Sequence, residues 1–207
     1  MTANVSQSFH ARRGSLSTGS AALALTVATV LALAALLPDS WQSLLGYRRG
    51  PVLEGLQVWR PLTAQVLHLG LGHLLPNLAA WGLLCLLLLA RMPAGALTWV
   101  LTGSVIGTAV GLVLTPGVAW YVGFSGALHG LLAGGAVWLW RPGSRRLAAA
   151  LLLGLAFKLA WDVFTGGGGG GLPAGARVVF EAHVWGSLGG VLTGGLIRWF
   201  TRRPPCV

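Results

Sequence analysis

The sequence predicts an all-α, polytopic membrane protein whose apolar helices span the bilayer six times. The chain has 207 residues, of which 55% are hydrophobic and only 9% are charged, and its mean hydropathy is +0.74. It contains only 4 acidic residues, too few to keep the surface of a soluble protein of this size in water. Apolar stretches of about 20 residues recur between turn and charge signals. These observations exclude a soluble globular domain.

The candidate spans follow one another as a single domain, residues 1–207. Each stretch approaches the roughly 20 apolar residues that cross a bilayer. Turn signals such as Pro116-Gly117 and Arg141-Pro142-Gly143 separate them. The expected spans are residues 20–37, 67–90, 96–114, 122–140, 146–165 and 180–200.

Three further segments lie outside the expected spans. Residues 1–19 form a cytoplasmic N-terminal segment. Residues 38–66 form an outer loop, whose tryptophans and tyrosine suit a position in the membrane interface. Residues 166–179 form a glycine-rich outer loop, and its run Gly166–Gly171 is interpreted either as a mobile gate or as a slack linker.

The distribution of arginine predicts the orientation. With the N-terminus in the cytoplasm, nine arginines lie on the cytoplasmic side and four on the outer side, in agreement with the positive-inside rule. The cytoplasmic set is Arg12, Arg13, Arg91, Arg141, Arg145, Arg146, Arg198, Arg202 and Arg203, and the outer set is Arg48, Arg49, Arg60 and Arg177. Because these residues are spread between apolar segments, the net charge of +10 does not indicate nucleic-acid binding.

A serine and a histidine occur at matching depth in two spans. Ser125 lies at the start of the fourth span, in Gly123-Phe-Ser-Gly126, and His183 lies at the start of the sixth. Ionisable groups at membrane depth are functional candidates by default. A serine becomes an effective nucleophile when a histidine accepts its proton. The pair indicates hydrolysis of a peptide bond within the bilayer, close to the outer face.

Glycines at four-residue spacing offer a way to bring these two spans together. They are Gly126, Gly130 and Gly134 in the fourth span and Gly186, Gly190 and Gly194 in the sixth. Small residues at this spacing let helix backbones approach closely in a membrane. If the two glycine ladders face each other, Ser125 and His183 meet within hydrogen-bond reach. Ordinary helix packing is the alternative interpretation.

The sequence suggests little that could orient the histidine. Glu181 is the acid nearest to His183 along the chain, but residues two apart on a helix do not share a face. We therefore expect a Ser-His dyad. His129 lies one turn after Ser125 and is expected to pack against the ring of His183, with simple space filling as the alternative.

Donors for a developing oxyanion are expected from the second span and from the serine itself. His73 and Asn77 are four residues apart and share a helix face, and the backbone N–H of Ser125 lies at a helix start. For Asn77, interhelical hydrogen bonding is the alternative. A metal site made of four histidines is not favoured, because their spacing matches no metal-ligand motif, and no metal or cofactor is expected. Those histidines are His68, His73, His129 and His183.

Four motifs, in this order, resemble those of the rhomboid intramembrane serine proteases. They are Trp59-Arg60-Pro-Leu-Thr, His68…His73-x-x-x-Asn77, Gly123-x-Ser125-Gly126-Ala127 and Ala182-His183-x-x-Gly186. The resemblance extends over nearly the whole chain and implies a rhomboid-like bundle. It implies Ser125 as the nucleophile and His183 as the base. It further implies that the oxyanion site and its surroundings are formed by His73, Asn77, Gly123, His129 and the Ser125 amide. The residues implied to give structural support are His68, Trp59, Arg60, Gly126 and Gly186.

Within that family, the chain is most similar to the rhombosortase branch. His129 stands where the family commonly has a tyrosine, and Lys158 and Asp162 lie near the end of the fifth span. The branch usually has a glutamate at the position of Asp162. Lys158 and Asp162 are four residues apart and can pair. A structural ion pair and substrate recognition are the two interpretations of that pair.

This similarity implies a substrate class and a location. The substrates are exported, membrane-anchored proteins with a C-terminal Gly-Gly motif, an apolar helix and a basic tail. The chain is then a multi-pass protein of a bacterial inner membrane, with both termini cytoplasmic and the active site open to the periplasm. Water is the expected acceptor of the acyl group, and an amine is the alternative. A catalytically inactive rhomboid-like protein that binds membrane helices as a chaperone or escort is the competing function.

Overall fold

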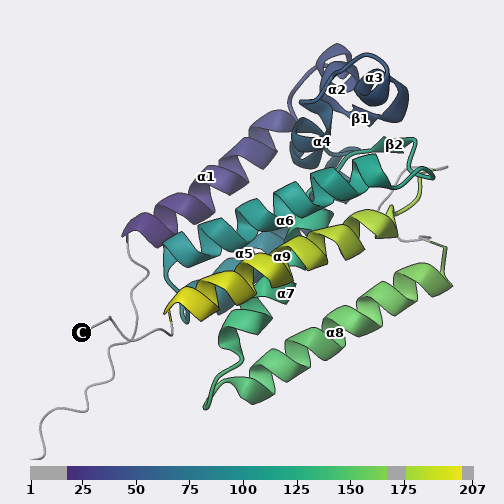
Figure 1. Ribbon diagram of the computed structural model, residues 1–207. Helices are drawn as coiled ribbons and strands as arrows, with labels where there is room; N and C mark the ends of the chain where they lie inside the picture. The colour runs from purple at the N-terminus through teal and green to yellow at the C-terminus, as the bar shows by residue number, and fades with distance from the viewer. Residues whose placement is uncertain (1–17, 167–175, 202–207) are drawn as a thin grey trace, which may run out of the picture.

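The computed structural model describes residues 18–166 and 176–201, and these fold mainly into helices (Figure 1). The elements are α1 (Thr18–Ala34), α2 (Asp39–Leu45), β1 (Tyr47–Arg48), α3 (Arg49–Leu53), α4 (Arg60–Thr63), the 3-10 helix η1 (Ala64–Val66), α5 (Leu71–Leu89), α6 (Ala94–Leu114), β2 (Trp120–Tyr121), α7 (Ser125–Leu139), α8 (Arg145–Phe164) and α9 (Phe180–Thr201). The all-α class is confirmed. The segment 1–19 and the run Gly166–Gly171 lie almost entirely outside the described residues.

A long helix occupies each of the six expected spans. The largest difference in a boundary is at α5, which begins at Leu71 and not at residue 67, because Gly70 adopts a positive φ of 92° just before the helix. Among the described residues, α5, α6 and α8 are long and apolar enough to cross a membrane. The pair α1 and α2, bent by 117°, is a fourth candidate. Six crossings therefore stay a prediction.

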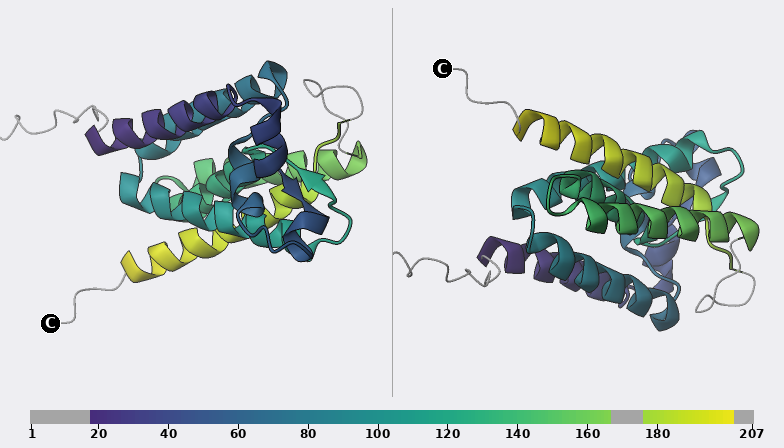
Figure 2. Two further views of the ribbon diagram at one scale, coloured as in Figure 1. Left: turned by 90° about the horizontal axis from the view of Figure 1, so that it is seen from above. Right: turned by 90° about the horizontal axis from the view of Figure 1, so that it is seen from below.

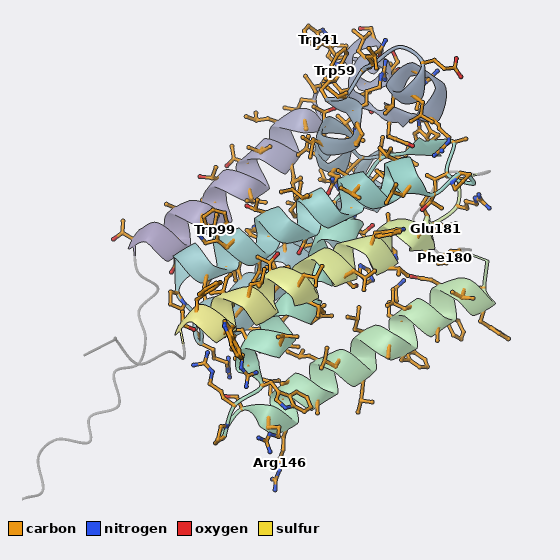
Figure 3. All side chains as sticks on the ribbon, viewed as in Figure 1. Trp41, Trp59, Trp99, Arg146, Phe180 and Glu181 are labelled. Atoms are coloured by element: carbon orange, nitrogen blue, oxygen red, sulfur yellow. The ribbon has the colours of Figure 1, made fainter. Side chains whose placement is uncertain are left out.

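The centre of the bundle is formed by α6, α7 and α9, which lie side by side (Figure 1, Figure 2). On one side, α1 packs against α5 and α6, and on the other side α8 packs against α7 and α9. Large apolar side chains such as Trp99, which is 65% exposed, cover the outside of the bundle (Figure 3). Such a surface suits contact with lipid and not with water.

The two glycine ladders of α7 and α9 face each other, as the sequence predicts. A Cβ added to a ladder glycine of α9 would collide with a backbone carbonyl oxygen of a ladder glycine of α7. The pairs are Gly186 with Gly126, Gly190 with Gly130, and Gly194 with Gly134. The backbones thus touch directly, and this brings the first residues of the two helices together.

Residues 38–66, predicted as a loop, fold into short elements on the end of the bundle where α7 and α9 begin. The strand β1 pairs with β2 in antiparallel fashion, with Tyr47 opposite Tyr121. The buried guanidinium of Arg60 donates hydrogen bonds to the carbonyl oxygens of Ser43 (2.9 Å) and Gly46 (2.7 Å). This segment is therefore tied both to itself and to the strand that precedes Ser125.

The arginines of the described residues divide between the two ends of the bundle. Arg48, Arg49, Arg60 and Arg177 lie at the end that carries β1 and β2. Arg91, Arg141, Arg145, Arg146 and Arg198 lie at the opposite end, where Figure 3 labels Arg146. The other four arginines of the predicted cytoplasmic set, Arg12, Arg13, Arg202 and Arg203, lie outside the described residues.

Candidate active site

Ser125 is the first residue of α7, and the loop before it is held from two sides. The N–H of Gly123 donates to the carbonyl oxygen of Ala64 (3.0 Å), and the hydroxyl of Tyr121 donates to the carbonyl oxygen of Gly123 (2.6 Å). Burial raises the pKa of Tyr121 to about 12, which keeps the phenol protonated as a donor. Gly123 has a φ of 131°, and a Cβ there would lie 2.8 Å from the His73 ring. This position therefore requires glycine.

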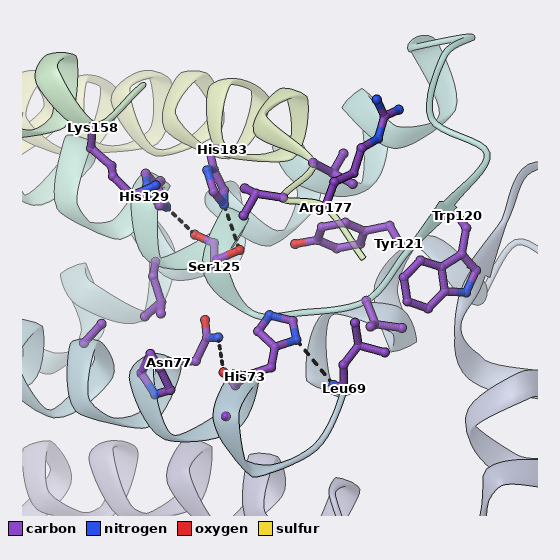
Figure 4. Close-up of a pocket in the computed structure, with 17 residues that line it drawn as sticks. Leu69, His73, Asn77, Trp120, Tyr121, Ser125, His129, Lys158, Arg177 and His183 are labelled. Atoms are coloured by element: carbon purple, nitrogen blue, oxygen red, sulfur yellow. Dashed lines mark hydrogen bonds between the residues drawn. The ribbon is translucent and has the colours of Figure 1, made fainter. Parts of the chain in front are cut away.

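Ser125 and His183 are joined by a hydrogen bond (Figure 4). The hydroxyl oxygen of Ser125 lies 2.9 Å from Nε2 of His183, which is 3% exposed and lies in the first turn of α9. The contact of Gly126 with Gly186, one residue after the serine and three after the histidine, makes this approach possible. The two side chains thus meet as the paired ladders predict.

His129 lies against both members of this pair. Its ring stacks on that of His183, with the centroids 3.9 Å apart and the planes 7° from parallel. Its Nδ1 is 2.7 Å from the carbonyl oxygen of Ser125, and a carbonyl can only accept, so Nδ1–H is the donor. The predicted packing of His129 against His183 is confirmed, and the ring limits the rotation of the imidazole.

The acid that contacts His183 is Asp162 and not Glu181. The carboxylate Oδ2 of Asp162 lies 2.8 Å from Nδ1 of His183, while Oδ1 forms the ion pair with Lys158 that the i, i+4 spacing predicts. Asp162 is 3% exposed. The expected dyad has no acid partner for His183, because Glu181 is the one acid near it in the sequence; Asp162 is the acid that contacts it. Ser125, His183 and Asp162 form a continuous hydrogen-bonded chain.

His73 and Asn77, on α5, lie across the cavity from His183 with donors to offer (Figure 4). The backbone N–H of Leu69 donates to Nδ1 of His73 (3.3 Å), so in the neutral ring Nε2 carries the proton. The amide nitrogen of Asn77 donates one proton to the carbonyl oxygen of His73 (2.8 Å) and keeps a second. Together with the N–H groups of the first turn of α7, these donors suit a developing oxyanion.

A cavity of about 290 Å³ connects these groups. Its walls come from α5, β2, α7, α8, α9 and the segments before α5, α7 and α9. They are Leu69, Gly72, His73, Pro76, Asn77, Ala80, Trp120, Tyr121, Val122, Ser125, Leu128, His129, Lys158, Arg177, Val178, Val179 and His183. Trp120 and Tyr121 are cavity residues that the motifs alone do not predict, although two aromatic residues just before Val122 and the serine motif were an available signal.

The remaining residues implied by the resemblance support the site from outside the cavity. The ring of His68 packs edge-on against His73 at 5.0 Å, and burial, with a smaller effect of His73, lowers the pKa of His68 to about 4, so it is neutral. The indole of Trp59 donates to the carbonyl oxygen of Leu44 (3.4 Å). Trp59 and Arg60 thus organise residues 38–66, while His68 holds His73.

The four-histidine metal set is not assembled. Among the described residues, a different group, His129, Asp162 and His183, brings its ligand atoms within 4.8 Å of one another. Both oxygens of Asp162 already have partners, and both ring nitrogens of His183 are hydrogen-bonded. The arrangement suits transfer of a proton from a hydroxyl to an imidazole, which is the first step of acyl transfer by a serine.

Comparison with protein families gives one match that covers the site. The model of the Rhomboid domain family matches residues 55–200. This range begins before α4 and ends within α9, so it includes every cavity residue. A comparison with curated proteins found no match.

Proposed function

The chain belongs to the rhomboid family, and on that premise we propose that it is an active intramembrane serine endopeptidase. One observation carries the proposal. The hydroxyl of Ser125 lies 2.9 Å from Nε2 of His183, inside a cavity at one end of an apolar helical bundle. A nucleophile and its base within hydrogen-bond reach are the minimum that acyl transfer requires.

In the proposed reaction, Nε2 of His183 takes the proton of Ser125 while Oγ attacks the substrate carbonyl carbon. The tetrahedral intermediate collapses as the histidine gives that proton to the leaving amine, and an acyl-enzyme is left on Ser125. A water molecule, deprotonated by the same imidazole, then attacks the ester and releases the new carboxylate. His183 acts first as base and then as acid in each half of the reaction.

The negative charge of the intermediate falls on the carbonyl oxygen. We assign the donors for this oxygen to Nε2–H of His73, the second amide proton of Asn77 and the N–H of Ser125. The hydrogen bond from Leu69 and the close contact with Gly123 hold the His73 ring in place before the substrate arrives. Donors fixed in advance need little reorganisation when the charge develops.

We expect alanine at His73 or Asn77 to lower kcat by about 10²–10³-fold and to change KM little, because these donors bind charge that is absent from the bound substrate. Initial rates measured with a cleavable membrane substrate in liposomes test this. Gln42→Ala is the control, since this amide on α2 is absent from the cavity wall. A rise in KM at unchanged kcat would assign the two residues to substrate binding instead.

The proposal includes six crossings, by α1, α5, α6, α7, α8 and α9, with both termini in the cytoplasm of a bacterium. Its support is that α7 and α9 pack within the bundle between helices that can span. The orientation rests on the positive-inside rule, because nine arginines lie on the proposed cytoplasmic side and four on the outer side. The cavity then opens toward the periplasm, the side from which an exported substrate approaches.

For the substrate, we propose a membrane-anchored exported protein with a C-terminal Gly-Gly motif before its apolar helix and basic tail. Two features support this rhombosortase-like assignment: His129 stands where the family commonly has a tyrosine, and Lys158 pairs with Asp162. Glycine weakens a substrate helix by about 1 kcal/mol per residue relative to alanine, which exposes the carbonyl.

We expect the protein in liposomes to cleave a single-span reporter with this design after or between its glycines. Replacing Gly-Gly by Ala-Ala should slow cleavage about 30-fold, because two positions worth about 1 kcal/mol each then oppose unwinding. Mass spectrometry of the released product measures the cleavage site and shows whether it ends in a carboxylate or an amine adduct. Equal rates for the two reporters would contradict the Gly-Gly assignment while leaving the protease activity intact.

A further inference from the structure

We propose that Asp162, carried by α8, positions the catalytic base His183 and determines which ring nitrogen bears the proton. The family resemblance supplies a serine and a histidine, and this third residue goes beyond it. The catalytic consequence of the inference rests on the proposed function, whereas the orientation of the imidazole does not.

The two hydrogen bonds of His183 define its tautomer. A carboxylate can only accept, so the 2.8 Å contact between Oδ2 of Asp162 and Nδ1 places a proton on Nδ1. In the neutral ring, Nε2 then has a free lone pair, and this lone pair faces the hydroxyl of Ser125 at 2.9 Å. The opposite tautomer would present N–H to the serine and could not accept its proton. The observed arrangement is the one that general-base catalysis needs.

The burial of Asp162 indicates that it positions His183 and does not serve only as an ion-pair partner for Lys158. The side chain of Lys158 is 47% exposed and that of Asp162 only 5%. The buried residues of α8 are Ala148, Leu155 and Asp162, so the last buried side chain of this helix, toward its C-terminal end, is a carboxylate. A pair formed only for mutual neutralisation would be complete with Oδ1 and would not need Oδ2 directed at His183. Burying a charge is costly unless it gains further partners, and that partner is His183.

One face and both nitrogens of His183 thus have partners among the described residues. His129 stacks on the ring, Ser125 contacts Nε2, and Asp162 contacts Nδ1. Lys158 balances the carboxylate charge through the other oxygen. Asp162 and its partner Lys158 both come from α8, which makes this helix part of the active site and not only part of the bundle wall.

We expect Asp162→Asn to lower kcat by roughly 10²–10⁴-fold with little change in KM, because an amide no longer selects the reactive tautomer. Asp162→Glu keeps an acceptor and should recover part of the rate. Glu181→Gln is the matched control, since it removes the acid closest to His183 in sequence and should keep the wild-type rate. Helical content and thermal melting of each variant show that it is folded.

The deciding measurement is the side-chain ¹⁵N spectrum of histidine-labelled protein, with His183→Gln used to assign the signals among the 5 histidines. We expect the Nδ1–H form of His183 in the wild type and its loss in Asp162→Asn. If that form persists in Asp162→Asn, or if Asp162→Asn loses it and still keeps the wild-type rate, the inference is overturned. A wild type that shows the Nδ1–H form but cleaves no reporter and binds no serine probe would refute the proposed function and leave the positioning of His183 standing.

Discussion

Replacing Ser125 by alanine is expected to abolish covalent labelling by a fluorophosphonate probe and to lower proteolysis by at least about 10³-fold. The probe reacts with a serine whose proton is removed by a neighbouring base, and the 2.9 Å bond to Nε2 of His183 provides that base. His183→Ala should have an effect of similar size, because nucleophile and base act as a unit. The measurement is a time course of labelling of the purified protein in detergent micelles.

Ser43→Ala is the control for this experiment. Ser43 lies on α2, its hydroxyl is bonded to the carbonyl oxygen of Ser40, and it is absent from the cavity wall. Labelling that survives in Ser125→Ala would place the reactive serine elsewhere. A wild type that is folded but never labelled would instead favour the catalytically inactive rhomboid-like protein that binds membrane helices as a chaperone or escort.

The positions of the long helices and the approach of Ser125 to His183 follow from patterns that are local in the sequence. Apolar length predicts α5, α6 and α8, and the four-residue glycine spacing predicts that α7 and α9 touch. Because the serine and the histidine each lie within a few residues of the first glycine of a ladder, contact between the ladders suffices to join the two side chains. No knowledge of the other helices is needed for that step.

The role of Asp162 could not be predicted in the same way. Its partner His183 lies 21 residues away on another helix, and α8 carries no glycine ladder or other pattern that indicates which face meets α9. The i, i+4 spacing to Lys158 suggested a complete local explanation for the charge. Only the packing of α8 shows that the second carboxylate oxygen is directed at the histidine.

The short elements of residues 38–66 were missed for a different reason. A strand of two residues, such as β1, is too short to leave an alternating pattern in the sequence. Its pairing with β2 depends on a segment more than 70 residues later. The hydrogen bonds of Arg60 are made to backbone carbonyls, which any sequence provides. Such structure arises from tertiary contacts and not from local propensity.

The glycine ladder predicts a second large effect, on stability and activity together. Gly190→Ala is expected to destabilise the bundle by about 3 kcal/mol, at the upper end of overpacking costs, because the added methyl meets the backbone of Gly130 and no flexible side chain can yield. Gly195→Ala, on the same helix, adds its methyl where no atom lies within 4 Å. It should be neutral or slightly stabilising, since alanine favours helix.

Thermal melting of the two variants in the same detergent, together with their probe labelling, measures both consequences. If α7 and α9 are forced apart at Gly190, then Ser125 and His183 at their common end lose hydrogen-bond contact, and Gly190→Ala should lose labelling below its own melting temperature. Labelling at the wild-type rate in a destabilised Gly190→Ala protein would mean that the ladder holds the fold but does not position the pair. Equal melting temperatures for the two variants would contradict this prediction. They would show that α7 and α9 can move apart to admit a methyl group at no cost in stability.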